Sequence, residues 1–487
     1  MKTFNHIYVL LCFLFISLTS CQLTEDIEDY KPSYSLDAET AINNQATAEL
    51  ALGGVYSGFR QRSTSSGNPE IYLLPSVLSG AMAPSIFNTG AEPEGYMANN
   101  PVSVNTGDNL GAYTRMYDIV NRCNWFIEKV SGIADSEFSP AGRKSEMIGE
   151  VKAIRATANF YLLRLWGQFY DTGSAYGITL RTDPARSAEA FPRNTVEESY
   201  EAIISDLDDA IANAPDLRAK YYTNKIYAKG LKVKVLLYKG DYPQAAVLAK
   251  DVIDNSGADF ELTTPYTSIF DGSSESLFNS PEVLFGVKGT PDENIGIGNF
   301  VGFYAGGTPA LEALALGSTD ISGQNITHDG SRFSSLYFTD FFGLVTYKYN
   351  ANGPYSMIYQ LRMAEVYLIH AEAAARAAGT VTPEALASLN AVRVRAGATT
   401  TGGDGFETYP ATISLSQFLE AVRIEKYIEL AMEQGEEWFD LVRYHFVDGF
   451  DVTTVKPTAT DPDKYILPID QNSIDAGGNV VEQNPGY

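Results

Sequence analysis

The stretch EVKAIRATANFYLLRLWG, residues 150–167, shows the pattern that decides the fold of this 487-residue chain. Its apolar side chains recur at alternating steps of three and four, at Val151, Ile154, Ala158, Tyr161 and Leu165. Such spacing places them on one face of an α-helix. We therefore predict a helix over residues 146–168 with one buried face, in a fold that is mostly α-helical.

Similar helical patterns lie on both sides of this stretch. We expect helices over residues 38–59, 110–130, 195–214, 224–238, 242–255, 359–378 and 383–396. Thr195 is a candidate N-cap, because Glu198 follows three residues later as in a capping box. Turns at Gly240 and Gly379 divide the last four helices into two pairs. Each pair has the helix–turn–helix arrangement of a tetratricopeptide repeat.

Two long stretches interrupt the helical pattern, at residues 60–105 and 257–355. Both are rich in Gly, Ser, Pro, Asn and aromatic residues, and the second contains a β-like piece at Val283–Val287. Irregular connections of this length are usually either functional or disordered. Their aromatic content argues against disorder. We expect a helical scaffold that carries two large irregular inserts.

The first residues have the composition of an export signal. Lys2 precedes an apolar run from Ile7 to Leu18, which is too short to span a bilayer. The run ends in Leu18-Thr19-Ser20-Cys21, which resembles a bacterial lipobox. This predicts a lipoprotein signal peptide over residues 1–20, and a lipid such as palmitate on the thiol of Cys21.

A polar, acidic tether is expected to follow over residues 21–37. Its acidic residues between Glu25 and Asp29 resemble the export tag that sends lipoproteins of the Bacteroidetes phylum to the cell surface. Each buried acyl methylene contributes about 0.8 kcal/mol, so several chains on Cys21 would hold the protein at the outer membrane. The alternative is an ordinary linker after a plain signal peptide.

Charge and cysteine content restrict both the partners and the source of stability. The formal charge is −25, with 60 acidic against 35 basic residues, so a nucleic-acid partner would be repelled. Of the three cysteines, only Cys123 would stay unmodified in the mature chain. Stability must then come from an apolar core rather than from disulfides. Cys123 lies in an apolar helical stretch and is expected to be a buried small hydrophobic residue.

Four segments carry a resemblance to a known family. They are residues 150–167, 363–373 with 389–397, 420–431 with 438–443, and 465–469 with 483–487. In this order, behind a lipobox-like sequence and an acidic tag, they resemble the SusD/RagB family of nutrient-binding outer-membrane lipoproteins. Two features depart from the family pattern. Lys426 stands where arginine is usual, and all three tryptophans lie in expected helices rather than in the inserts.

The resemblance implies a fold and a function. The fold is a SusD-like domain over residues 38–487, with a tetratricopeptide-like scaffold and ligand-site inserts at 60–105 and 257–355. The function is that of a surface lipoprotein that binds an oligosaccharide, or in some members a peptide, without covalent chemistry or a cofactor. The ligand would be delivered to a SusC-like TonB-dependent outer-membrane transporter, for which residues 224–255 are a candidate interface.

Aromatic residues of the inserts are the candidate ligand contacts. A sugar ring packs its C–H face on aromatic rings, while its hydroxyl groups need polar partners at the rim. The preferred candidates, which have Gly or polar neighbours, are Tyr72, Phe87, Asn88, Tyr96 and Tyr304. Arg332 is a further candidate for the rim. The alternative is that each ring packs its own loop onto the scaffold.

Three glutamates stand at intervals of four, at Glu425, Glu429 and Glu433, so their carboxylates share one helical face. A metal or acid/base cluster is one interpretation, but the accompanying Glu-x-x-His pairing of such bundles is absent from this helix. We favour ion pairs that dock the C-terminal helices. The candidate partners are Arg393, Arg395, Arg423 and Arg443.

Histidine and carboxylate patterns give no firm sign of an enzyme. The mature chain would retain three widely spaced histidines, which lack zinc-ligand spacing, so we predict no metal site. His370, in an apolar helix, is expected to be a satisfied core residue. Two other classes stay open: a glycoside hydrolase or lyase with a carboxylate pair in a cleft, and a repeat scaffold that binds no small ligand.

Overall fold

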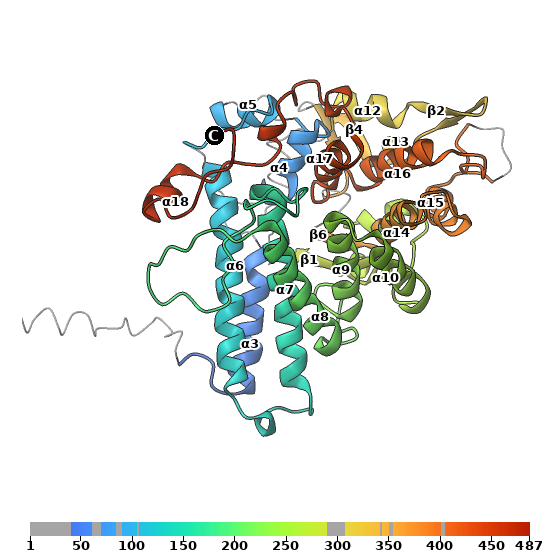
Figure 1. Ribbon diagram of the computed structural model, residues 1–487. Coiled ribbons are helices and arrows are strands. Elements are labelled where there is room, and N and C mark those ends of the chain that lie inside the picture. Colours follow the sequence, from blue (N-terminus) through green and yellow to red (C-terminus); the bar gives the residue numbers. More distant parts are fainter. Residues whose placement is uncertain are drawn as a thin grey trace, which may run out of the picture.

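Long helices form the scaffold (Figure 1). The structure is a computed structural model that describes residues 40–60, 70–83, 90–104, 107–289, 307–340, 343–349, 354–400 and 405–487, with all side chains in these ranges except those of residues 70–73, 108, 340, 343 and 345. The long helices are α3 (Gln45–Tyr56), α6 (Gly107–Ser131), α7 (Arg143–Trp166), α8 (Val196–Asn213), α9 (Lys225–Lys239), α10 (Tyr242–Asn255), α14 (Met363–Ala378), α15 (Pro383–Arg395), α16 (Leu415–Leu430) and α17 (Glu436–Asp448).

Successive helices pack side by side, as tetratricopeptide-like pairs require. From α6 to α10 each helix contacts the next, α10 packs on α14, and α14 packs on α15. Gly240 ends α9 with a φ of 87°, in the left-handed region that residues with a side chain rarely adopt. The capping box of Thr195 and Glu198 is confirmed at the start of α8. The predicted mostly α fold class is therefore confirmed.

Two expected helices start later than predicted. The helix expected from residue 38 begins at Gln45, with Asn44 as its N-cap. The helix expected from residue 359 is the second. Residues 359–362 belong to strand β6 (Ser356–Arg362), which pairs antiparallel with β1 (Val283–Gly289), so α14 begins only at Met363. Both strands are almost fully buried, and pairing satisfies backbone groups that would otherwise lack hydrogen-bond partners. The β-like piece predicted at Val283–Val287 is confirmed and extends to Gly289.

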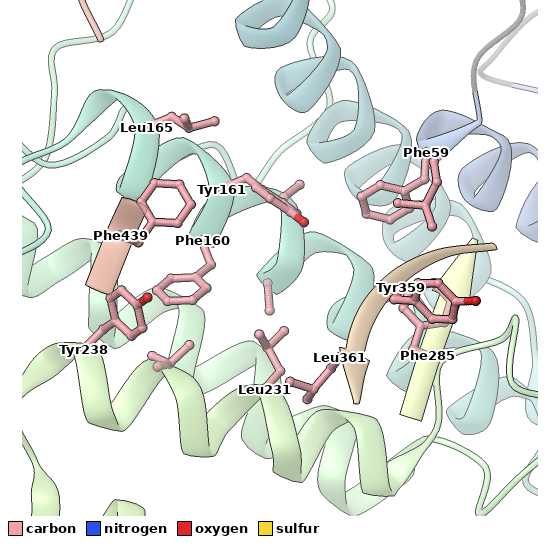
Figure 2. Close-up of a cluster of buried hydrophobic side chains, with 14 of the residues drawn as sticks. Phe59, Phe160, Tyr161, Leu165, Leu231, Tyr238, Phe285, Tyr359, Leu361 and Phe439 are labelled. Atoms are coloured by element: carbon pink, nitrogen blue, oxygen red, sulfur yellow. The ribbon is translucent and has the colours of Figure 1, made fainter. Parts of the chain in front are cut away.

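The core joins these strands to the helices. Figure 2 shows Phe160 of α7 close to Tyr238 of α9 and Phe439 of α17, whereas Tyr161 points the other way, toward the side where Phe285 of β1 lies. The rings of Phe160 and Tyr238 meet edge to face, with centroids 5.6 Å apart. This geometry adds to the apolar burial that drives folding.

Cys123 is confirmed as a buried residue in this core, without a disulfide partner. Burial raises the pKa of its thiol far above the usual value. The thiol therefore stays protonated and behaves as a small hydrophobic group.

The inserts contain more regular structure than expected. The first holds α4 (Glu70–Ser79) and α5 (Ala91–Met97). Besides β1, the second holds η3 (Tyr266–Phe270), η4 (Glu275–Asn279), α12 (Pro309–Ala315), β2 (Ser318–Ile321), β3 (Gln324–Thr327), α13 (Arg332–Leu336), β4 (Tyr337–Asp340) and β5 (Gly343–Thr346). β2 pairs with β3 and β4 with β5, both antiparallel. Contacts with the scaffold stabilise these short elements. Their own sequences therefore need little periodicity.

Further short elements lie outside the inserts. They are η1 (Ser57–Phe59), η2 (Asp135–Glu137), η5 (Val452–Thr454), η6 (Pro462–Lys464) and α18 (Gln471–Ala476). Within the described ranges, we find no helix with the length and apolar character needed to cross a bilayer.

Candidate ligand-binding site

The described parts of the two inserts meet at one end of the molecule (Figure 1). Thr308, the N-cap of α12, donates from Oγ1 to the carbonyl oxygen of Gly80 just after α4, at 2.6 Å. Asn99, just after α5, donates from Nδ2 to the carbonyl oxygen of Leu78 at 2.9 Å. We call this meeting of α4, α5 and α12 the insert junction. The candidate ligand contacts belong to these elements or adjoin them in the sequence.

Close packing on α17 fixes the first insert. Gly435, just before α17, has φ of 74°, and a Cβ there would lie 2.0 Å from the Cβ of Pro75 in α4. Tyr427 of α16 also donates its hydroxyl to the carbonyl oxygen of Ser79 at 3.1 Å. Glycine at position 435 therefore permits both the backbone turn and the approach of α4.

A set of buried charges fixes the second insert, and we call it the buried ion network. Its cations are Arg332, Lys348, Arg362, Arg393 and Arg395, and its anions are Glu282, Asp329, Glu425, Glu429 and Glu433. All ten side chains are buried. Because five positive charges face five negative ones, the network carries no net charge into the core. It joins α13 and β6 to α15 and α16.

Glu429 lies at the centre of this network. Its carboxylate accepts hydrogen bonds from Arg332 and Arg362, both at 2.9 Å, and from Arg395 at 2.5 Å. Burial alone would raise the pKa of Glu429, but the three guanidinium groups outweigh it and hold the pKa well below its usual range. The carboxylate is therefore ionised and structural.

The preference for ion pairs over a metal cluster is supported by these contacts. Arg393 contacts Glu425 and Arg395 contacts Glu429, as predicted. The predictions for Arg423 and Arg443 were wrong. Arg423 pairs with Glu420, and Arg443 binds both oxygens of Glu372, because each lies closer to those carboxylates than to the three glutamates.

Arg332 was wrongly expected at the rim of a ligand site. It is 3% exposed and contacts Asp329, Glu425 and Glu429. With its guanidinium fully engaged in the buried ion network, it has no surface to offer a ligand.

Most of the predicted ligand contacts lie outside the described residues, and so does the lipidation residue. This holds for Cys21, Phe87, Asn88 and Tyr304, and for the side chain of Tyr72, whose backbone belongs to α4. Tyr96 in α5 is described: it is 1% exposed, and its hydroxyl donates to the carboxylate of Glu92. In this structure its ring packs inside the first insert, and its contact with a ligand stays a prediction.

No local pattern in the sequence identifies the carboxyl group that α17 buries against both inserts. Glu437 is 1% exposed, and its Oε1 accepts the N–H of Met432 at 3.2 Å. The hydroxyl of Ser76 in α4 contacts this carboxyl group, and the hydroxyl of Tyr337 in β4 is near enough to interact with its charge. Burial raises the pKa of Glu437 to about 7, an effect that Ser76 offsets only in part. Only long-range packing identifies this group, since neighbouring residues give no signal.

His370 is confirmed as a satisfied core residue. Its Nδ1 lies 2.8 Å from the hydroxyl of Ser388, and burial lowers its pKa. In the described ranges, no group of three or more His, Cys, Asp or Glu side chains is arranged to hold a metal ion.

Two family models match separate parts of the chain. The model described as "SusD family" matches residues 324–487, and the model described as "Starch-binding associating with outer membrane" matches residues 75–235. A SusD-like protein from Bacteroides ovatus is 26% identical over 69% of this chain and 65% of its own length. SusD-like protein P38 from Formosa agariphila is 23% identical over 54% of this chain and 48% of its own length. The chain thus covers less than two thirds of either relative.

Solved structures resemble the chain over nearly its whole length. A SusD superfamily protein from Parabacteroides distasonis has a TM-score of 0.71 at 20% identity, covering 93% of this chain and 100% of its own. A putative sugar-binding protein from Bacteroides vulgatus has a TM-score of 0.69 at 24% identity, covering 92% and 100%. A laminarin-binding SusD-like protein has a TM-score of 0.68 at 20% identity, covering 91% and 100%. These structures define a SusD-type fold. The two family models place residues 75–235 and 324–487 in SusD-type families.

The buried ion network predicts a large cost for removing one cation. Arg362→Met leaves Glu282, Glu429 and Glu433 short of a partner, and breaking a buried pair costs about 3–5 kcal/mol. Urea unfolding followed by circular dichroism measures the loss in the free energy of unfolding. The control, Lys225→Met, breaks an exposed pair with Asp216 and should cost less than about 1 kcal/mol. Equal small losses in both variants would contradict a structural role for the network.

The raised pKa of Glu437 predicts that the free energy of unfolding falls as the pH rises. Its folded-state pKa of about 7 lies above the usual 4.5, so the folded protein holds this proton more tightly than the unfolded chain. This contribution is complete below about pH 4.5, and it is lost as the pH rises to about 7. The loss is on the order of 3 kcal/mol at 1.36 kcal/mol per pKa unit.

Glu437→Gln should remove this dependence, because the amide needs no proton and keeps an acceptor for Met432. We expect the variant to be more stable than the unmodified chain at about pH 8 and similar to it at about pH 4.5. Urea unfolding at both values measures the difference, with Glu137→Gln, on the exposed surface, as the control. A stability gain that is the same at both pH values would refute the assignment.

Proposed function

We propose that this protein binds an oligosaccharide at the cell surface and delivers it to a SusC-like TonB-dependent outer-membrane transporter. The observation that carries the proposal is a SusD-type fold in which two aromatic-rich inserts meet at one end. Relatives described as starch-associated, sugar-binding and laminarin-binding support a carbohydrate as the ligand class. A peptide is the alternative, since the inserts hold no tryptophan for sugar stacking.

The proposed ligand contacts are Tyr72, Phe87, Asn88 and Tyr304, with Tyr96 supporting the first insert from within. Aromatic rings would stack on the sugar, and Asn88 would bind its hydroxyl groups. Anchoring of the insert junction to α17 and to the buried ion network supports this placement. Contacts held on rigid elements bind with a smaller entropic cost than contacts on free loops.

The proposed attachment to the membrane depends on residues outside the described ranges. We propose cleavage after residue 20, a lipid on Cys21, an acidic tether over 21–37 and a single SusD-like domain over 38–487. The description of one matching family as associating with the outer membrane supports this location. The acidic tether supports an outward-facing position.

We propose binding without catalysis. A glycoside hydrolase needs one carboxylic acid with a raised pKa beside a second carboxylate, both in contact with the sugar. Glu437 has a raised pKa, but it is 1% exposed and out of reach of a substrate. The sugar-binding and laminarin-binding neighbours are likewise described by what they bind.

Calorimetric titration tests the ligand class. With laminarihexaose, maltohexaose and a mixture of short peptides as probes, we expect heat from an oligosaccharide and none from the peptides. Tyr304→Ala should weaken binding roughly tenfold, the loss of one stacked anchor. The control is Tyr367→Ala on α14, a half-exposed tyrosine outside the inserts. Peptide binding alone, or chromatographic detection of shortened oligosaccharides, would overturn the proposal.

Co-purification tests the anchor and the partner. In the native outer membrane, the unmodified protein should stay with the membrane in mild detergent extracts and retain a large β-barrel protein. Cys21→Ser should release it from the membrane, because the lipid provides the anchor. Cys123→Ala, at a buried core position, is the control. Equal retention of the Cys21→Ser protein would contradict the lipid anchor, and repeated absence of a barrel would contradict the transporter.

A further inference from the structure

A cavity of about 550 Å³ lies beside the scaffold helix α6. Its other walls are the α7–α8 loop, residues 167–195, and the C-terminal region around α18. Figure 1 shows this loop beside α6 and below α18. None of the described residues that line the cavity belongs to either insert. The volume falls within the roughly 300–1,000 Å³ of small-molecule pockets.

Buried hydrogen bonds hold one wall of the cavity. Asn124 of α6 is 1% exposed and donates from Nδ2 to the carbonyl oxygens of Arg181 and Asp183, each at 3.1 Å. Its Oδ1 accepts from Arg155 at 2.8 Å, and Arg155 in turn pairs with Asp206 of α8. The loop is thus bonded to α6 and, through Arg155 and Asp206, connected to α7 and α8.

A second anchor holds the opposite wall. Arg193, near the end of the loop, donates to the carbonyl oxygen of Trp166 at 2.8 Å and to Oδ1 of Asn484 at 2.7 Å. Asn484 also donates to the carbonyl oxygen of Leu467 at 2.7 Å. These hydrogen bonds hold the C-terminal wall against the end of α7. The walls of the cavity are therefore in place without a ligand.

The lining combines aromatic rings with an arginine that has no anionic partner. Tyr113, Tyr117 and Phe191 supply the rings. The guanidinium of Arg181 lies 3.8 Å from the centroid of the Phe191 ring. In the described part of the chain it makes no ion pair and donates no hydrogen bond, although Asp183 is only two residues away. Stacking orients the guanidinium and leaves its N–H groups available.

Other polar groups of the lining are also available. Asn121 accepts the N–H of Ala185 at 2.8 Å through Oδ1, and within the described ranges its Nδ2 has no partner. The buried hydroxyl of Thr179 likewise has none there. The carboxylates of Asp183 and Glu189 add acceptors. Donors and acceptors therefore alternate around the aromatic rings.

We propose that this cavity is a second carbohydrate-binding site, which takes one or two neutral sugar rings; this rests on the proposed carbohydrate-binding function. Aromatic rings pack on the C–H face of a pyranose, while Arg181 and Asn121 donate to its hydroxyl groups and Asp183 accepts from them. The presence of Asp183 and Glu189 beside one arginine, in a chain with a charge of −25, disfavours an anionic ligand.

Saturation-transfer NMR on the full chain tests this site with glucose, galactose, mannose, xylose, maltose, laminaribiose and glucuronate. We expect signal from at least one neutral sugar. In the Tyr304→Ala background, which removes an anchor of the proposed first site, part of this signal should remain, and adding Arg181→Gln should weaken that part about tenfold. The matched control is Arg186→Gln. Arg186 lies on the same loop and stacks on Trp125, but it pairs with Glu128 outside the cavity lining. Equal melting temperatures of the variants would show that each is folded.

Each outcome separates this site from the insert junction. Neutral-sugar binding that persists in Tyr304→Ala and is lost when Arg181→Gln is added supports the second site, even if the first fails. Binding that depends on Tyr304 alone, or no binding by any neutral sugar, overturns it, and the hexasaccharide titrations then judge the proposed function separately. Stronger Arg181-dependent binding of glucuronate than of glucose overturns the neutral-ligand assignment. An equal loss in Arg186→Gln shows a general effect of loop charge and also overturns the proposal.

Discussion

The buried ion network is the constraint on which the ligand-binding end depends. Arginines from α13, β6 and α15 converge on the carboxylate of Glu429 in α16, so these elements have one relative position in which every charge is paired. An apolar cluster of equal volume could be as stable, but it would tolerate small shifts. Charge pairing in a medium of low dielectric penalises such shifts, because a displaced guanidinium loses several partners together. The second insert is thus seated by electrostatics rather than by periodic apolar packing.

Glu437 shows the opposite arrangement a short distance along the chain. In the network each carboxylate has cationic partners, whereas Glu437 is buried beside the neutral hydroxyl groups of Ser76 and Tyr337. Its proton is held by burial rather than by a neighbour. Uncompensated polar groups reduce stability, and in native proteins they concentrate where function restricts the choice of residue.

Local patterns in the sequence were sufficient for the scaffold and insufficient for the inserts. The three-and-four spacing from Val151 to Leu165 and the Thr195–Glu198 capping box depend on neighbours within one or two turns, so α7 and α8 were predictable. Strand β6 depends on β1, about 70 positions earlier, and its last four residues were mistaken for helix. Burial of Arg332 likewise depends on Glu425 and Glu429, far along the chain. Ligand contacts were inferred from composition alone, which does not place side chains in space.

Residues near the C-terminus form hydrogen bonds with the end of α7. Asn484 binds the carbonyl oxygen of Trp166, 318 positions earlier, and the backbone N–H of Leu467 bonds to the carbonyl oxygen of Leu165. Contacts of such sequence separation form late, because the loop between them must close first. The end of α7 therefore remains unfinished until nearly the entire polypeptide is present. This part of the protein can therefore reach its final packing only after both segments, about 300 positions apart, have been synthesised.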